Sequence, residues 1–328
     1  MTRSSIVSSS SRLPRAAALL GVLLVLALAA CSSSPQLGKP TTETPKADDD
    51  VVASLRSDAE DGKAESKIAL ANVLAYGTGT TPERRREAAI WYRRAAEQGD
   101  AVGQFTLALW LWHGTNVEPN RVEAVKWWRQ AADQGRADAQ FWLAGAYEKG
   151  EGGLPKDLEE AARWYRRSAE QGFDQSQTSL GQMYAEGKGV PRDDREAASW
   201  LKKAAAQHCA SGEHYLAAMY AEGRGVPRDE KEAARLYLLA AEADFTVSMT
   251  ALGEAYENGR GVARDRTCAY FWYGFAAKRG FSLGADQRDA LAPQLSRSER
   301  AKAERMVADA VFEGKVLKRP RCPGEKAR

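Results

Sequence analysis

The chain has 328 residues, with 47 lysines and arginines against 44 aspartates and glutamates, which gives a formal charge of +3. Three arginines within the first thirty residues account for that excess, so the rest of the chain is close to neutral. Nucleic acid is therefore not an expected partner, because binding to phosphates depends on an excess of positive charge.

Residues 1–30 predict a bacterial lipoprotein signal peptide. Basic residues precede the run AAALLGVLLVLALAA, which is too short to span a membrane comfortably. The run ends in LAAC at 28–31, which resembles the lipobox, where a signal peptidase cleaves before Cys31 and its thiol carries a diacylglycerol. Ser32 follows, and the family's sorting rule then implies an outer-membrane anchor that faces the periplasm. The alternative is an ordinary cleaved signal with an unmodified cysteine.

Residues 31–50 predict a disordered tether, because they lack aromatic residues and are rich in Ser, Thr, Pro and Asp. The next segment, VVASLRSDAEDG at 51–62, predicts a short helix. This helix is expected to cover the first unit of the repeat array that follows.

The stretch WYRRAAEQGD at 91–100 recurs along the chain. Related segments begin at positions 127, 164, 200, 236 and 272, so the spacing is 36 or 37 residues. A second block precedes each of them, and SLGQMYAEGKGVPRDDREAASW at 179–200 is its clearest form. Six copies at this period predict a solenoid of helix pairs, because one pair cannot bury both of its apolar faces.

The fourth unit illustrates the predicted mechanics. Leu180 and Tyr184 lie on one face of a first helix, and the glycines at 187 and 189 allow the turn that ends it. Asp193 has the position of an N-cap, and Glu196 completes the spacing of a capping box. The second helix then has a stripe of alanines and one large ring. We expect those rings to be core: Trp91, Trp127, Trp164, Trp200 and Trp272.

The unit resembles the Sel-1-like repeat, which is related to the tetratricopeptide repeat, over residues 64–281. The resemblance implies an all-α, right-handed superhelical solenoid of six helix pairs that binds proteins. We therefore assign residues 51–281 to the repeats with their N-terminal cap. Residues 282–314 are assigned to two capping helices, the second of which is expected to extend through VFEG, and 315–328 to a loose basic tail.

No residues predict catalysis or a cofactor, so the protein is expected not to be an enzyme. Ser199 and Lys202 match S-x-x-K, but the partner motifs of penicillin-binding proteins are missing from the sequence. His208, Cys209 and His214 are close in sequence, yet their spacing fits no standard zinc site, and a structural role is favoured.

Three cysteines follow the lipobox: Cys209, Cys268 and Cys322. An odd number in an oxidising compartment permits at most one internal disulfide. A bond between Cys268 and Cys322 would fold the tail onto the last repeat. Free thiols throughout are an equal alternative.

A candidate binding surface lies on the first helices, which line the inner face of related solenoids. The second and third units have large rings at positions that are small or polar in the other units. Rings at positions that the fold does not bury mark an interface. The candidate partner-binding residues are Leu109, Trp112, His113, Trp142 and Tyr215. The alternative is that the second and third units simply pack differently.

Two roles are consistent with a lipid-anchored solenoid. Some similar lipoproteins are immunity proteins that neutralise lipase effectors delivered into the periplasm by type VI secretion. The alternative is an envelope scaffold for polysaccharide export or control of cell-wall enzymes. Both roles are consistent with the sequence, and each implies a different protein partner.

Overall fold

The computed structural model describes residues 49–62, 64–77, 79–313, 316–319 and 321–322. The predicted signal peptide, Cys31 and nearly all of the tether lie outside these residues. The first helices of the six units are α3 (Ala64–Tyr76), α5 (Ala101–His113), α7 (Ala137–Lys149), α9 (Asp174–Glu186), α11 (Ala210–Glu222) and α13 (Thr246–Asn258). The second helices are α4 (Pro82–Glu97), α6 (Arg121–Asp133), α8 (Leu158–Glu170), α10 (Asp194–Ala206), α12 (Glu230–Glu242) and α14 (Arg266–Lys278).

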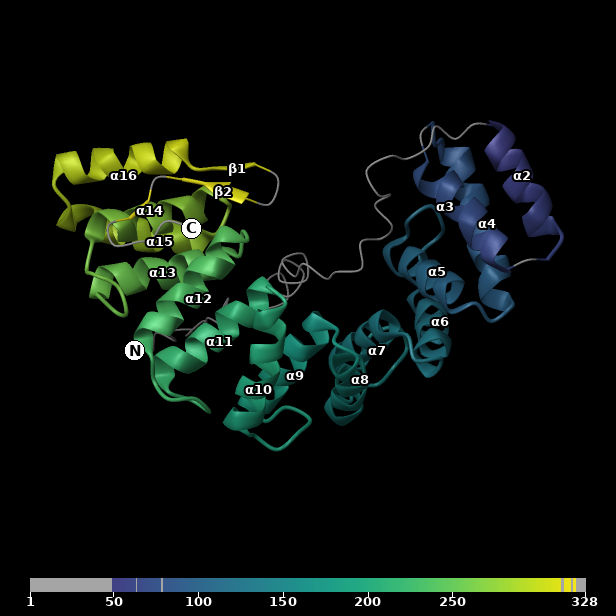
Figure 1. Cartoon of the computed structure of the whole chain (residues 1–328), viewed down its shortest axis with the longest axis horizontal. Coiled ribbons are helices and arrows are strands. Elements are labelled where there is room, and N and C mark those ends of the chain that lie inside the picture. Colours follow the sequence, from purple (N-terminus) through teal and green to yellow (C-terminus); the bar gives the residue numbers. More distant parts are fainter. Residues whose placement is uncertain (1–48, 63, 78, 314–315, 320, 323–328) are drawn as a thin grey trace, which may run out of the picture.

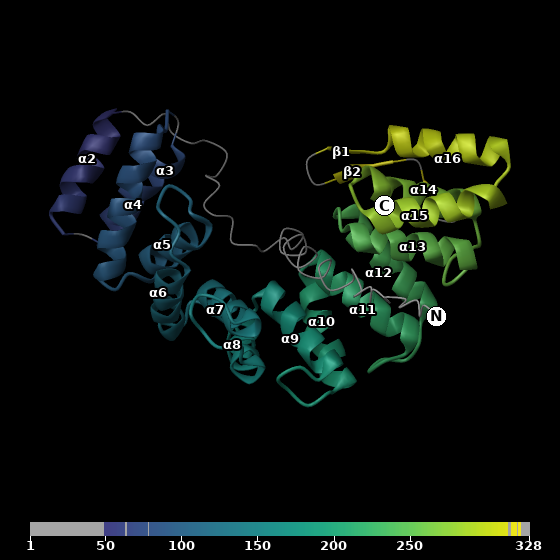
Figure 2. The ribbon, with the colours of Figure 1, turned by 180° about the vertical axis from the view of Figure 1, so that it is seen from behind.

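The helix pairs stack into a solenoid, which confirms the predicted fold class. Each second helix packs against the first helix of its own unit and against the first helix of the next. The units follow an arc in Figure 1, and α5, α7 and α9 lie toward its inner side. Figure 2 shows the same arc from behind. Within the described residues, none of the helices is long and apolar enough to cross a membrane.

The two basic residues of the recurring motif have separate roles. Arg166 donates a hydrogen bond to the Tyr184 hydroxyl of the next unit. Arg167 stacks over the Trp164 ring of its own helix, 4.5 Å from the centroid. Arg129 donates the same bond to Tyr147, whereas Lys202 lies over the ring of Tyr220. The second contact recurs at Arg94 over Trp91 and at Lys203 over Trp200. Cations therefore connect neighbouring units and cover the tryptophans.

Buried glutamines connect the units a second time, a role that sequence reasoning missed. The Gln140 side-chain nitrogen donates to the carbonyl of Ala132 at 3.1 Å, and its oxygen accepts from Gln171 at 2.8 Å. Equivalent bonds are made by Gln104 to Ala96 and Gln134, and by Gln177 to Ala169 and Gln207. Each amide thus satisfies a backbone carbonyl in the last turn of the preceding helix.

The glycine turns have the backbone conformation that the sequence predicted. Gly187 ends α9 in the left-handed region, and Gly189 has a φ of +66°. A Cβ atom on Gly189 would lie 2.0 Å from the carbonyl oxygen of Leu158 in the preceding unit, and one on Gly225 would lie 1.8 Å from that of Asp194. In the fourth and fifth units the second glycine of the turn is therefore required by close approach as well as by its φ.

The core assignment of the tryptophans was only partly correct. Trp91, Trp164 and Trp272 are buried, but Trp127 and Trp200 are half-buried. In those two units the next residue, Trp128 or Leu201, occupies the interior. Trp127 can stay at the surface because its ring nitrogen donates to Glu123 at 3.2 Å, and Lys203 covers the exposed face of Trp200.

Helix α2 (Asp49–Glu60) caps the N-terminal end. It buries Val52 and Ala59, and Arg56 pairs with Glu87 on α4 at 2.8 Å. The sequence predicted this helix.

At the other end, α15 (Ser282–Leu291) packs on α14 as the first helix of a seventh unit would. A Cβ on Gly284 would meet the Cβ of Ala276 at 2.7 Å, which matches the contact of Gly212 with Ala204 at 2.6 Å. Counted from the helix start, Arg288 takes the place of the buried leucine in the six units. No second helix follows in register, because α16 (Arg297–Asp309) packs on α14 instead.

The C-terminal segment differs from its prediction. Helix α16 begins with the complete capping box at Ser296 and Glu299, as expected, but it ends at Asp309. The short helix η1 (Ala292–Gln294) precedes α16, and two strands follow it. These are β1 (Val311–Glu313) and β2 (Val316–Lys318), which pair in antiparallel fashion. The β-branched and aromatic residues of VFE and VLK favour strands over helix. The described part of the predicted loose tail is therefore structured.

Candidate functional site

An aromatic cluster lies where the first helices of the second and third units meet. The Trp128 ring of α6 is completely buried between Trp112 of α5 and Trp142 of α7. The ring centroids of Trp128 and Trp142 are 5.2 Å apart and stacked, and those of Trp112 and Trp128 are 4.9 Å apart. The outer rings are half-buried, so each combines a face packed on the core with a part that solvent reaches.

The five predicted binding residues do not form one group. Leu109 is only 7% exposed, so it belongs to the core and its assignment to a binding surface is wrong. Leu109 lies on α5, which packs against the second helices α4 and α6. His113 is exposed and contacts the Trp142 ring edge-on, with centroids 5.9 Å apart. Tyr215 is half-buried on α11, outside this cluster.

Positive charge lies beside the cluster. The Arg121 guanidinium lies over the Trp112 ring, 4.9 Å from its centroid, and forms a 3.8 Å ion pair with Glu151. Partial burial lowers the pKa of His113 below its usual value, and the charge of Arg121 lowers it further. His113 is therefore neutral at physiological pH.

Tyrosine hydroxyls reach the first helices in several other units. The hydroxyl of Tyr165 on α8 donates to Glu148 on α7 at 2.8 Å, and Tyr273 donates to Glu257 on α13 at the same distance. Burial and then the neighbouring carboxylate raise the pKa of the Tyr165 hydroxyl. Sequence reasoning missed these pairs, although a tyrosine after the tryptophan in WY was a visible signal.

The histidines and the cysteine near the fifth unit do not converge on a metal site. His208 is exposed, whereas Cys209 is buried against Thr178 and Ser211. The His214 ring nitrogen Nδ1 lies 2.9 Å from the Ser248 hydroxyl of the next unit. In the part of the chain that the structure describes, His, Cys, Asp and Glu form no group of three or more that could hold a metal ion.

His214 should make stability depend on pH. Burial lowers its pKa from 6.5 to about 4, so between these values the unfolded chain binds a proton that the folded chain does not. We expect the free energy of unfolding to fall by about 3 kcal/mol between pH 6.5 and pH 4 through this group. Urea unfolding across that range measures it. His214→Gln should have a smaller loss over the same range, and an equal loss in both proteins would contradict the assignment.

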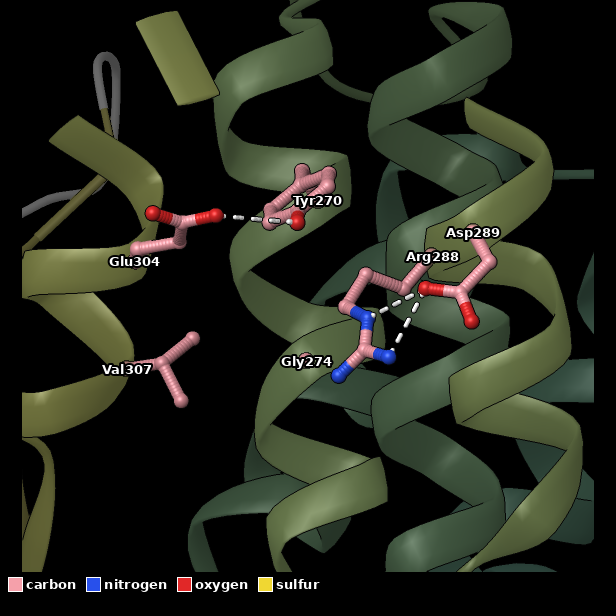
Figure 3. A pocket seen from close by; sticks show the side chains of 6 residues that line it. All are labelled: Tyr270, Gly274, Arg288, Asp289, Glu304 and Val307. Atoms are coloured by element: carbon pink, nitrogen blue, oxygen red, sulfur yellow. Dashed lines mark hydrogen bonds and ion pairs between the residues drawn. The ribbon is translucent and has the colours of Figure 1, made fainter. Parts of the chain in front are cut away.

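A pocket of about 310 Å³ lies between α14, α15 and α16 (Figure 3). It exists where Arg288 stands in place of a buried leucine. The Arg288 guanidinium is bound to Asp289 at 2.8 Å, and the Tyr270 hydroxyl bonds to Glu304 at 3.4 Å. Because the charged groups already have protein partners, the pocket does not point to a particular ligand.

The geometry of the units agrees with a known family. The model of the Sel1 repeat matches residues 64–100, 101–135, 137–173, 174–209, 210–245 and 246–281. These six segments are the six helix pairs of the structure. The chain belongs to the Sel1 repeat family. As in other repeat solenoids, the most extensive helix contacts here lie within a unit or between adjacent units.

Two solved Sel1 structures are similar to this chain in sequence and in fold. A protective antigen of uropathogenic Escherichia coli is 31% identical, with a TM-score of 0.72, over 77% of this chain and 54% of the antigen. The match thus spans about half the length of the antigen. A Sel1 repeat protein of Oxalobacter formigenes is 31% identical, with a TM-score of 0.60, over 65% of this chain and 85% of that protein.

A more distant similarity extends to an immunity protein of Pseudomonas aeruginosa. It is 20% identical, with a TM-score of 0.40, over 74% of this chain and 90% of that protein. At this level the similarity concerns the repeat fold and says nothing about a shared partner. No curated protein matches the chain closely enough to count as a relative.

Proposed function

We propose that this Sel1 repeat protein binds a protein partner on the inner face of its solenoid, at the cluster of Trp112, Trp128 and Trp142. The observation that carries the proposal is the half-burial of two indole rings that are stacked on a fixed third ring. Such rings lose little conformational entropy on binding, and tryptophan is enriched among the residues that dominate protein interfaces.

The most concrete form of this role is an immunity protein that inhibits a lipase effector of type VI secretion. The predicted lipid anchor at Cys31 supports it, because an anchored inhibitor would stand at the membrane that the lipase attacks. The second form is an envelope scaffold for polysaccharide export or cell-wall enzymes. A purified protein that inhibits a lipase encoded beside its own gene favours the first form. Co-purification with components of an export or cell-wall complex favours the second.

The binding surface is tested best at His113, which is exposed beside the cluster, and at the half-buried Gln182 further along the inner face, because Trp112 and Trp142 also support the core. We expect His113→Glu with Gln182→Glu, on the inner helices α5 and α9, to weaken partner binding at least tenfold, about 1.4 kcal/mol. The affinity of each purified variant for the protein partner is measured by calorimetry. The melting temperature should change little, because surface substitutions alter stability by about 0.5 kcal/mol or less.

The matched control makes the same charge change on the second helices. Ile90→Glu with Ser199→Glu places two carboxylates at exposed positions of α4 and α10. This control should bind as the wild type does. Equal weakening in both variants, or in neither, would contradict binding on the inner face.

A further inference from the structure

The last unit departs from the repeat motif at two positions, and the C-terminal segment fills both. The first is the residue four before the motif's first ring or its leucine replacement. Units one to five have a glutamate there, whereas the sixth has Cys268. The glutamates are Glu87, Glu123, Glu160, Glu196 and Glu232. In the structure the Cys268 sulfur is bonded to that of Cys322, 54 residues further along the chain.

The second position is the residue three after the ring. In units one, three and four it is a cation that covers the tryptophan, but in the sixth it is Phe275. Arg319 of the C-terminal segment supplies the missing cation, with its guanidinium 4.6 Å from the centroid of the Trp272 ring. The same guanidinium lies 3.5 Å from the Glu242 carboxylate of α12, and the side chain is only 4% exposed.

Other contacts also hold the segment, at its start and at Leu317, which is buried in the cluster that contains Trp272. Lys278 of α14 donates to the carbonyls of Val307 and Ala310, at 2.9 and 3.1 Å, where α16 ends. Strands β1 and β2 have three residues each, and an isolated pair of strands that short is not stable in water. The stable attachment of β2 therefore depends on Leu317, on Arg319 and on the bond to Cys268.

We propose that residues 316–319, 321 and 322 form an oxidation-dependent cap, which seals the outer face of the sixth unit only when the bond between Cys268 and Cys322 is closed. Closure removes two protons and two electrons from the two thiols, and a disulfide oxidant accepts them and becomes a dithiol. Before closure the chain that follows α16 must return Cys322 to α14 against its own conformational entropy, so Arg319 leaves Trp272 for most of the time. The capped form of the protein is thus the form that an oxidising compartment produces.

Cys322→Ala tests the proposal without altering the core around Cys268. In hydrogen–deuterium exchange of the purified full chain, we expect amides of β1, β2 and the last turn of α16 to exchange at least tenfold faster than in the wild type. Helices α5 to α10 should exchange at the wild-type rate, which shows that the solenoid stays folded. Wild-type protein treated with dithiothreitol should show the same acceleration in the cap.

Two further variants make the test specific. Arg321→Ala removes an exposed charge beside Cys322 and should exchange as the wild type does. Arg319→Met keeps the disulfide and removes the guanidinium, so its cap should exchange at a rate between those of the wild type and of Cys322→Ala. If Cys322→Ala protects the cap as well as the wild type does, the proposal is wrong. Faster exchange throughout the solenoid would equally overturn it, since the bond would then stabilise the whole fold.

Discussion

Gly225→Ala is expected to destabilise the solenoid by about 3 kcal/mol or more. The residue has a φ of +66°, which costs an alanine about 1–2 kcal/mol. The added Cβ would also lie 1.8 Å from the carbonyl oxygen of Asp194 and 2.3 Å from its carbon. Those atoms belong to the first turn of α10, so only movement of one unit relative to the next can relieve the collision. Urea unfolding followed by circular dichroism measures the loss.

Gly172→Ala is the matched control. Gly172 also has a positive φ, of +91°, but an added Cβ would find no atom within 4 Å. Its substitution should therefore cost only the backbone term of about 1–2 kcal/mol. If both variants lost the same stability, close packing of the turn against the preceding unit would not contribute.

The pair of glycines illustrates how far the sequence predicted this fold. The period of 36 or 37 residues, the apolar spacing and the Asp caps were sufficient to predict six helix pairs over residues 64–281, because each is local and is repeated several times. The need for a left-handed residue in the turn was also local. The carbonyl that excludes a side chain at Gly189 or Gly225 belongs to another unit, and only the stacked structure reveals it.

Contacts between units could not be predicted from the sequence either. The glutamine bonds from Gln140 to Ala132 and Gln171 repeat with the period of the chain, but nothing in one copy shows that the amide faces a helix end of the copy before. The C-terminal segment has no second copy, so the repeat gave no guide to it. Its short strands and the contact of Arg319 with Trp272 depend on partners that are distant in sequence.

The candidate site was predicted in position but not in detail. The unusual rings of units two and three correctly indicated a cluster on α5 and α7 that includes Trp112 and Trp142. The sequence could not show that Trp128, from the intervening helix, lies between them. Different packing in these two units is therefore part of the explanation, because each outer ring packs on the core, and binding at the accessible part of the rings stays a prediction.

Trp128→Ala is expected to destabilise the protein by about 3–5 kcal/mol, as the removal of a large buried ring does. The ring is completely buried, and its loss would leave a cavity between the rings of Trp112 and Trp142. Those rings would then lose the surface that fixes them, so partner binding should weaken even at temperatures where the variant is folded. Thermal unfolding and calorimetric binding measure the two effects.

Trp200→Ala is the matched control for this second substitution. The motif alone would assign it an equally large loss, but its ring is half-buried and has Lys203 on one face, 3.7 Å from the centroid. We expect a cost of about 1–2 kcal/mol, because the half-buried ring removes less apolar surface from water than a fully buried ring does. Binding on the inner face should be unchanged, because Trp200 lies on the second helix α10. If Trp200→Ala lost as much stability as Trp128→Ala, the core would depend on the motif's first ring in every unit. The degree of burial of the ring would then not determine the loss of stability.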